Sequence, residues 1–227
     1  MSSDGAGVGQ RPGESSPATP RRGLLFIVSA PSGAGKTTLV ERLVATTPGV
    51  KRSRSYTSRP PRSRERDGFD YNFITREHFH LMLAARKFLE WAEICGHLYG
   101  TSASDTEQVL GMGDDLVLVI DVQGARKVRQ LGIPVIGVFV LPPSFAALEK
   151  RLHDRRQDSP SQLRRRLDAA RSEVGAFTEY DYVIVNDDLD RSVEDLRAIV
   201  LAERVRTAAV RVEAETIVRS LEGGGER

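Results

Sequence analysis

The fold of this chain is decided by one stretch near its start, Leu24-Leu25-Phe26-Ile27-Val28-Ser29-Ala30-Pro31-Ser32-Gly33-Ala34-Gly35-Lys36-Thr37. Its first part is a continuous apolar run, typical of a strand buried on both faces of a sheet. Its second part is a glycine-rich turn that opens a helical pattern. In such a turn, backbone N–H groups surround a phosphate and the helix N-terminus adds a positive dipole. The stretch therefore predicts a strand, a phosphate-binding loop and a helix.

Individual residues of this loop have separate expected roles. The Lys36 ammonium can reach the β- and γ-phosphates of a nucleoside triphosphate, and the Thr37 hydroxyl can bind Mg²⁺. Ala30 replaces the first glycine of the usual pattern, which is tolerated if its φ is negative. The predicted ATP-binding residues of this segment are Ala30, Pro31, Ser32, Gly33, Ala34, Gly35, Lys36, Thr37 and Thr38.

Three more continuous apolar runs indicate further buried strands, at Leu116–Asp121, Val135–Leu141 and Tyr182–Asn186. Helical patterns separate most of the runs, at Lys36–Ala45, Gly124–Leu131, Ser144–His153 and Leu163–Val174. This alternation predicts an α/β fold of the P-loop NTPase type, with a parallel sheet and helices on both faces.

Asp121 ends the second of these runs, where a Walker-B-type aspartate would bind Mg²⁺. It is also placed to cap the helical pattern at Gly124, and the sequence leaves both roles open. Thr37 and Asp121 are thus the predicted metal ligands, and Mg²⁺ is the predicted cofactor.

Two regions depart from the alternation. About seventy residues after the first helix exceed the length of a βα loop and predict an inserted subdomain, with a helix near 75–87. A long helical pattern starts near Arg191, where Ser192-Val193-Glu194-Asp195 resembles a capping box, and continues with few breaks to Leu221. We expect its distal part either to protrude or to meet a partner. The pattern leaves the oligomeric state open.

Composition limits the function classes. The chain has 227 residues, of which 40% are hydrophobic, and a formal net charge of +2, which argues against nucleic-acid binding. Its single cysteine, Cys95, fits a reducing compartment. No apolar run approaches the roughly 20 residues needed to span a bilayer, and Arg21-Arg22 precedes too short a run for a secretion signal. We expect a cytoplasmic protein that binds neither nucleic acid nor membrane. Residues 1–21, rich in Gly, Ser and Pro, predict a disordered tail.

The inserted region begins with a strongly basic stretch. Residues 51–66 carry seven Lys and Arg residues and a single acid, Glu65. Arg59 and Arg62 flank Pro60-Pro61, and the two prolines stiffen the loop. Two guanidinium groups in a stiff loop suit a phosphate dianion. The alternatives are a solvated basic loop and a nucleic-acid patch.

A carboxylate follows in an apolar segment, where burial is costly unless the charge is paired. Glu90 could accept hydrogen bonds from the N1–H and N2–H₂ edge of guanine, while Thr101 or Ser55 could donate to guanine O6. Tyr71 and Tyr99 could donate to a phosphate oxygen, although each tyrosine alone is more often a core residue.

Together these motifs resemble the guanylate kinase family over about residues 23–200. The matching segments are Ala30–Thr37, Thr57–Arg62, Gly68–Phe73, Phe88–Ala92, Tyr99–Thr101, Ile120–Gly124 and Val183–Asp187. The resemblance implies Mg²⁺-dependent phosphoryl transfer from ATP to GMP, giving ADP and GDP. One departure is Val119, which stands where the family often has a first acid.

The resemblance also implies an organisation and a residue set. The core would comprise 22–54, 105–144 and 167–222, the GMP-binding subdomain 55–104 and the lid 145–166. GMP would contact Ser55, Arg59, Arg62, Tyr71, Glu90, Tyr99, Thr101 and Asp121. Asn186 would lie near the adenine of ATP. The catalytic residues would be Lys36, Arg59, Arg151, Arg155 and Arg166.

The lid arginines also have a physical rationale. Arg151 and Arg155 are four residues apart, so on one helix they repel each other until a phosphate lies between them. Two rival functions remain. One is another P-loop kinase, similar to the ribose 1,5-bisphosphate kinases, and the other is a non-catalytic guanylate-kinase-like protein-binding module.

Overall fold

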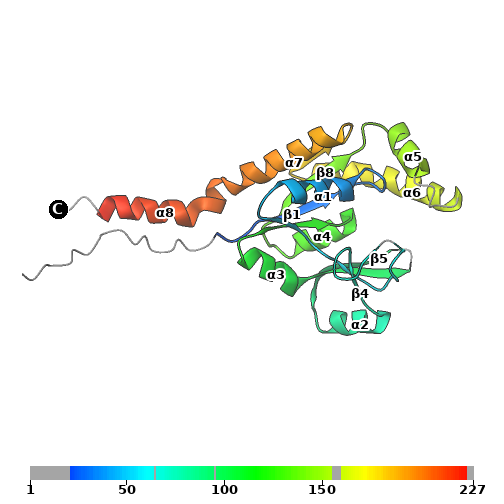
Figure 1. The fold of residues 1–227 in the computed structure, drawn as a ribbon, viewed down its shortest axis with the longest axis horizontal. Coiled ribbons are helices and arrows are strands. Elements are labelled where there is room, and N and C mark those ends of the chain that lie inside the picture. Colours follow the sequence, from blue (N-terminus) through cyan, green and yellow to red (C-terminus); the bar gives the residue numbers. More distant parts are fainter. Residues whose placement is uncertain (1–20, 64, 95, 155–159, 224–227) are drawn as a thin grey trace, which may run out of the picture.

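The computed structural model describes residues 21–63, 65–94, 96–154 and 160–223 (Figure 1). Its centre is a five-stranded parallel sheet in the order β2-β7-β1-β8-β9. The strands are β1 (Leu25–Ser29), β2 (Val50–Arg52), β7 (Asp115–Val119), β8 (Ile136–Leu141) and β9 (Tyr182–Val185). The predicted parallel α/β fold is confirmed, and β2 is the strand that the apolar runs did not indicate.

Helices cover both faces of this sheet, which explains why its strands are apolar without alternation. On one face, Phe26 and Val28 of β1 pack with α1 (Lys36–Thr46) and α7 (Leu189–Arg204). On the other face, Leu25 and Ile27 pack with α3 (Ala103–Gly111) and α4 (Val122–Gln130). Each β1 residue from Leu25 to Ser29 is therefore buried.

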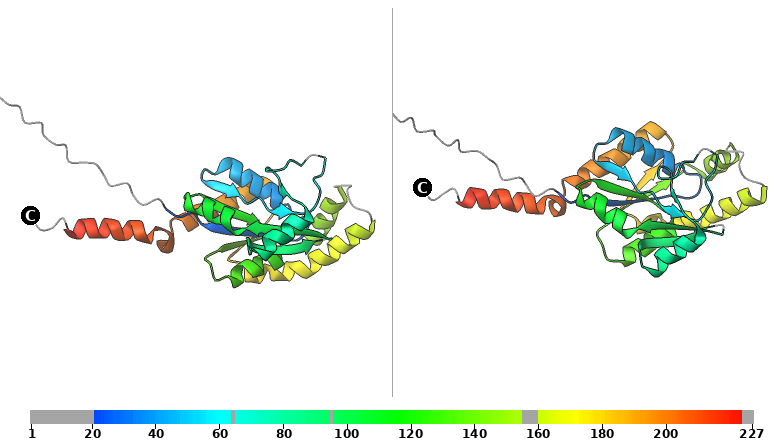
Figure 2. Two further views of the ribbon diagram at one scale, coloured as in Figure 1. Left: turned by 90° about the horizontal axis from the view of Figure 1, so that it is seen from below. Right: turned by 60° about the horizontal axis from the view of Figure 1, so that its bottom comes forward.

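Two helices lie at one end of the molecule, away from the C-terminus (Figure 2). They are α5 (Phe145–Asp154) and α6 (Pro160–Glu173), which is followed by the short 3₁₀ helix η1 (Val174–Glu179). Leu148 and Leu152 of α5 pack against Ala170 of α6. This apolar contact joins the two helices into one unit.

The inserted region forms its own four-stranded sheet in the order β4-β3-β6-β5. Its strands are β3 (Tyr56–Thr57), β4 (Asn72–Phe73), β5 (Phe88–Ile94) and β6 (His97–Ser102), and its helix is α2 (Arg76–Ala84). Phe79 of α2 is fully buried and stacks on Phe88 at 4.5 Å between ring centroids. The predicted helix is present, and its buried face fastens it to the sheet.

The C-terminal helix differs from the expectation in two ways. It is broken at Val205 into α7 and α8 (Thr207–Gly223). The predicted capping box at Ser192 is also wrong, because α7 begins earlier, after Asp188, whose side chain accepts from the Arg191 N–H at 2.8 Å. Within the described ranges, no helix is both long enough and apolar enough to cross a membrane.

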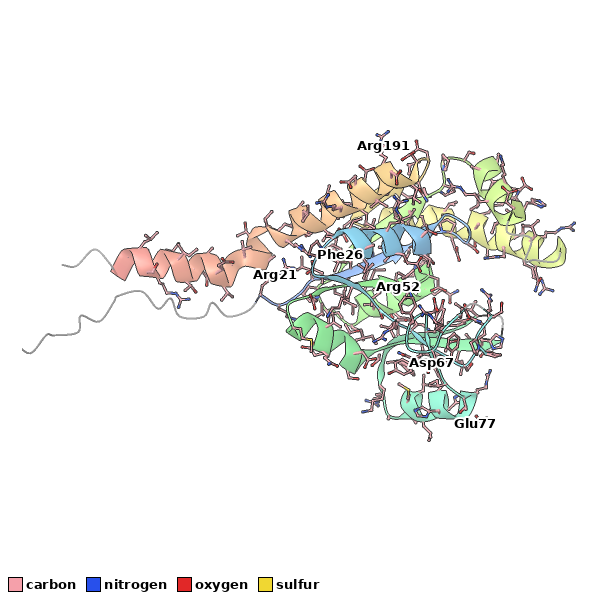
Figure 3. The ribbon with its side chains drawn as sticks, viewed as in Figure 1. Arg21, Phe26, Arg52, Asp67, Glu77 and Arg191 are labelled. Carbon is pink, nitrogen blue, oxygen red and sulfur yellow. The ribbon has the colours of Figure 1, made fainter. Side chains whose placement is uncertain are left out.

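A buried carboxylate ties the two ends of the core together. Asp115 is fully buried at the start of β7, and it accepts from the Leu24 N–H at 2.8 Å and from Arg204 Nε at 2.7 Å. Arg21 forms a third contact with it, at the place where the described chain begins (Figure 3). These contacts lie at the amino end of β7, opposite the phosphate-binding loop.

Candidate functional site

The predicted donor-site residues gather at the carboxyl edge of the parallel sheet. The phosphate loop follows β1, Asp121 follows β7 and Asn186 follows β9. In parallel α/β sheets, ligands bind outside this edge. The Nζ of Lys36 donates to the Ile120 carbonyl at 2.9 Å, so the loop and the end of β7 are joined directly.

The loop adopts the conformation that its glycines allow. Gly33 and Gly35 have φ values of 96° and 93°. A Cβ on Gly33 would lie 2.8 Å from Leu152, and one on Gly35 would lie 2.6 Å from the Asn186 amide nitrogen. Among the described non-glycine residues, only Arg86 has a positive φ, so Ala30 sits in a conformation that alanine tolerates.

The charges of two carboxylates act on the ammonium of Lys36. Burial lowers the pKa of its ammonium, and the charges of Asp121 and Glu173 oppose that shift. Burial raises the pKa of the Glu173 carboxyl, and the charge of Lys36 acts in the other direction. Sequence reasoning missed Glu173, because it ends α6 outside any recognisable motif.

Asp121 caps α4, which is one of the two roles, helix cap and Mg²⁺ ligand, that the sequence left open. Its Oδ1 accepts from the Gly124 N–H at 2.7 Å. The other oxygen donor predicted for a metal, the Thr37 hydroxyl, lies on an exposed residue in the first turn of α1. Within the residues that the structure describes, no cluster of three or more His, Cys, Asp or Glu could hold a metal ion. This donor set suits Mg²⁺, which binds through few protein oxygens together with phosphates and water.

Helices α5 and α6 contact the loop directly. Arg151 donates through Nη2 to the Asn186 carbonyl at 2.8 Å, and the Asn186 side chain donates to the Ala34 carbonyl at 2.7 Å. Arg166 donates through Nε to Ser32 Oγ at 3.1 Å. Arg155, the third predicted lid contact, lies outside the described residues.

A second polar cluster lies on the inserted sheet, against α4. Glu90 is 6% exposed, and its Oε1 accepts from the Thr101 hydroxyl at 2.6 Å. Burial raises the pKa of the Glu90 carboxyl, and the Thr101 hydrogen bond opposes that shift. Its Oε2 lies 3.1 Å from where a Cβ on Gly124 would be, and Asp121 Oδ1 lies 3.3 Å from the same point. The two carboxylates therefore approach each other beside the start of α4.

A third cluster surrounds Arg59. Its Nη2 donates to Glu65 Oε1 at 2.8 Å, and its Nε donates to the Tyr99 hydroxyl at 3.1 Å. The Tyr71 ring centroid lies 5.6 Å from the guanidinium carbon, and burial raises the pKa of the Tyr71 hydroxyl. Arg62 is exposed in the same loop, and its N–H donates to Glu65 Oε2 at 2.8 Å.

Glu65 neutralises part of this basic cluster. Burial acts to raise the pKa of its carboxyl, but the hydrogen bonds from Arg59 and from the Arg62 N–H outweigh burial and hold that pKa below its ordinary value. Sequence reasoning gave Glu65 no role, although its position as the single acid in a basic stretch was an available signal.

The inserted sheet places these two clusters on one surface. Thr57 pairs with Tyr99 between β3 and β6, and Glu90 pairs with Thr101 between β5 and β6. Tyr99 and Thr101 are two residues apart on β6, so their side chains point to the same side of the sheet. Ser55, half-buried just before β3, accepts from the Asn72 N–H through its carbonyl at 3.0 Å.

Comparisons with known proteins identify the family of this chain. The family model described as guanylate kinase matches residues 22–203. The guanylate kinase of Nitrosospira multiformis is 50% identical over 186 residues, covering 82% of this chain and 89% of that protein. That of Syntrophotalea carbinolica is 45% identical, covering 86% and 92%. The crystal structure of guanylate kinase from Anaplasma phagocytophilum has a TM-score of 0.69 at 31% identity, covering 83% and 90%. This chain belongs to the guanylate kinase family.

Proposed function

We propose that this chain transfers a phosphoryl group from ATP to GMP, giving ADP and GDP. The observation that carries the proposal is the approach of Glu90 and Asp121 at Gly124, because it brings a guanine-selective carboxylate next to the donor edge of the sheet. The names of the relatives, guanylate kinase in each case, support the same reaction.

Guanine selection follows from the chemistry of Glu90. A carboxylate accepts from the N1–H and N2–H₂ of guanine, whereas adenine offers no such pair of donors. The Thr101 hydroxyl donates to Glu90 Oε1 and so orients the carboxylate, which leaves the Ser55 hydroxyl as the candidate donor to guanine O6. A buried site that relies on paired hydrogen bonds rejects a ligand lacking them, because its own polar groups are then left unpaired.

The acceptor phosphate is assigned to the third cluster. Arg59 and Arg62 provide guanidinium charge, and Tyr71 and Tyr99 provide hydroxyl donors. Glu65 pairs with Arg59 at 2.8 Å and orients that guanidinium. An incoming phosphate dianion offers Arg59 a stronger partner.

The donor side requires positioning more than covalent chemistry. Residues 30–38 present backbone N–H groups to the triphosphate, Lys36 reaches its β- and γ-phosphates, and Asn186 lies near the adenine. Thr37 and Asp121 would hold Mg²⁺, which when bound neutralises charge on the phosphates. The GMP phosphate oxygen is already anionic, so no general base is needed.

The remaining assignments concern closure and organisation. We assign residues 145–166 to a lid, 55–104 to the GMP-binding subdomain, and 22–54, 105–144 and 167–222 to the core. Arg151, Arg155 and Arg166 would neutralise the transferred phosphoryl group as the lid excludes water. The contacts of Arg151 with the Asn186 carbonyl and of Arg166 with Ser32 of the loop support this assignment.

We further assign the activity to the cytoplasm, without nucleic acid or membrane as a partner. The single cysteine and the net charge of +2 support this assignment. The presence of Lys36, Thr37 and Arg59 favours an enzyme over a binding module.

The test is ADP production from MgATP with AMP, GMP, CMP, UMP or ribose 1,5-bisphosphate as acceptor. Rapid turnover with GMP, and little with the other acceptors, is expected. Turnover with a different acceptor would remove the guanine site but keep the kinase. No turnover despite intact ATP binding would favour the binding module.

A further inference from the structure

Helix α8 has no part in the site described above. It follows residue 203, where the match to the family model ends, and it projects away from the sheet and from α5 and α6 (Figures 1 and 2). It contacts α7 at the bend, and every residue from Arg211 to Glu222 is exposed. Its 17 residues leave it close to the length at which an isolated helix is only marginally stable in water.

The surface of α8 carries an apolar stripe, which is half-buried at its first residue, Val210, and exposed from there on. Val210, Ala214, Ile217 and Leu221 follow one another at spacings of four, three and four residues, so they share one face. Ile217 is 53% exposed and Leu221 is 72% exposed, and Val218 flanks them at 49%. This spacing is the one by which two helices pack along a common seam.

We propose that this stripe packs, in antiparallel orientation, against the same stripe of a second copy of this chain. A two-fold contact requires only that one surface complement itself. The other segment of the chain that could cover the stripe is residues 1–20, whose large apolar side chains are only Met1 and Val8. That composition offers too little apolar surface to replace a second α8.

Charge favours the antiparallel orientation. Helix α8 carries two arginines and three acids, so it is nearly neutral and does not repel its copy. The charged residues are Arg211, Arg219, Glu213, Glu215 and Glu222. When Val210 of one helix lies opposite Leu221 of the other, Arg211 is level with position 220 of the second copy. Glu222 of that copy then lies on the same side of the seam, two residues or roughly 3 Å further along the axis, within reach of the arginine side chain, and symmetry repeats the pair. Antiparallel helix dipoles also attract each other.

The shape of the molecule favours the same orientation. The core lies at the amino-terminal end of α8 (Figure 1). An antiparallel pair places the two cores at opposite ends of the seam, where they do not collide. Two helices of this length bury less surface than a standard interface of about 1,600 Å², so we expect a micromolar dissociation constant.

Sedimentation equilibrium of the full chain over a wide concentration range tests this interface. The wild type should form a dimer, and Ile217→Lys should raise the dissociation constant at least 10-fold. Thr216→Lys is the matched control, since it adds the same charge one position off the stripe and should leave the constant within about 3-fold. The proposal is overturned if the wild type is still monomeric at a protein concentration of about 100 μM. A dimer that Ile217→Lys leaves intact also overturns it.

A charge exchange tests the orientation. Arg211→Glu should weaken the dimer, and adding Glu222→Arg should restore it. Because Arg211 also lies 3.9 Å from Glu215 of its own helix, circular dichroism should check that helicity is kept. Failure of the double variant to recover would rule out the antiparallel register. GMP kinase turnover should be unchanged in all these variants, so this test is independent of the proposed activity.

Discussion

The phosphate loop and the inserted sheet hold their candidate ligands in different ways. The loop depends on backbone geometry at a strand–helix junction, with glycines at positive φ and few essential side chains. The inserted sheet has two strands of only two residues each, and its polar surface consists of side chains that orient one another, such as Thr101 with Glu90 and Glu65 with Arg59. Affinity for phosphate can therefore come from the main chain, whereas base selection requires particular side chains.

The sharpest test of the donor region is Lys36→Ala. We expect kcat to fall at least about 10²-fold, because the ammonium is the one charged side chain of the loop and we assign it to the transferred phosphoryl group. Steady-state kinetics with saturating GMP measures this effect. Lys51→Ala, which removes an exposed lysine paired with Asp114, is the control and should retain its rate. A near-normal rate for Lys36→Ala would contradict the assigned role.

The matching test of the acceptor region is Glu90→Gln. The amide presents an N–H₂ group to the guanine donors or turns away from them, so we expect kcat/KM for GMP to fall about 10²-fold while KM for ATP stays constant. Glu93→Gln, on the same strand but half-exposed, should behave as the wild type. Equal losses for GMP and ATP would show that Glu90 supports the fold and does not select the base.

Asp121 belongs to both regions, and two substitutions separate its roles. Asparagine keeps a side-chain oxygen for the Gly124 N–H but loses the charge, so Asp121→Asn should lower kcat about 10-fold and raise the Mg²⁺ requirement at nearly unchanged stability. Asp121→Ala should in addition cost about 1 kcal/mol of unfolding free energy. Kinetics at varied Mg²⁺ and urea denaturation measure the two effects. If Asp121→Asn has an unchanged Mg²⁺ requirement, Asp121 is a helix cap and not a metal ligand.

The smallest expected effect is the contribution of Glu65 to the stability of the fold and its loss at acidic pH. Its folded-state pKa is depressed, so its stabilisation is present above the unfolded pKa, near 4.3, and is lost as pH falls through the folded value. At pH 7 the free energy of unfolding of the wild type should be about 1 kcal/mol higher than that of Glu65→Gln, and this difference should disappear at acidic pH. Denaturation at pH 7 and pH 3 measures it. A constant gap would mean that the pair with Arg59 does not stabilise the fold.

The parallel sheet was predictable because its strands are buried on both faces. Continuous apolar runs such as Leu25–Ser29 leave little choice of structure. β2 escaped notice because only Val50 of its three residues is buried. The bend at Val205 was missed because neither glycine nor proline marks it, and the start of α7 was misplaced because several polar residues there could cap a helix.

The residues of the candidate site also fall into those that the local sequence predicts and those that it does not. Lys36 and Asp121 stand next to predicted strands, so their common edge could be predicted from topology alone. The contact of Glu65 with Arg59 and the position of Glu173 beside Lys36 depend on how separate segments pack, and no local pattern encodes that. Glu90 was identifiable because an acid in an apolar segment requires a partner.

The buried carboxylate of Asp115 determines where this fold can be opened and rejoined. By holding Arg21 and Arg204 together, it brings the beginning and the end of the core to one point, far from the phosphate loop. A short peptide linker could join these positions, and new termini could then be opened in a surface loop. Circular permutants of this kind should keep their nucleotide sites. The same point is where additional segments can be appended to the core without reaching the reaction edge.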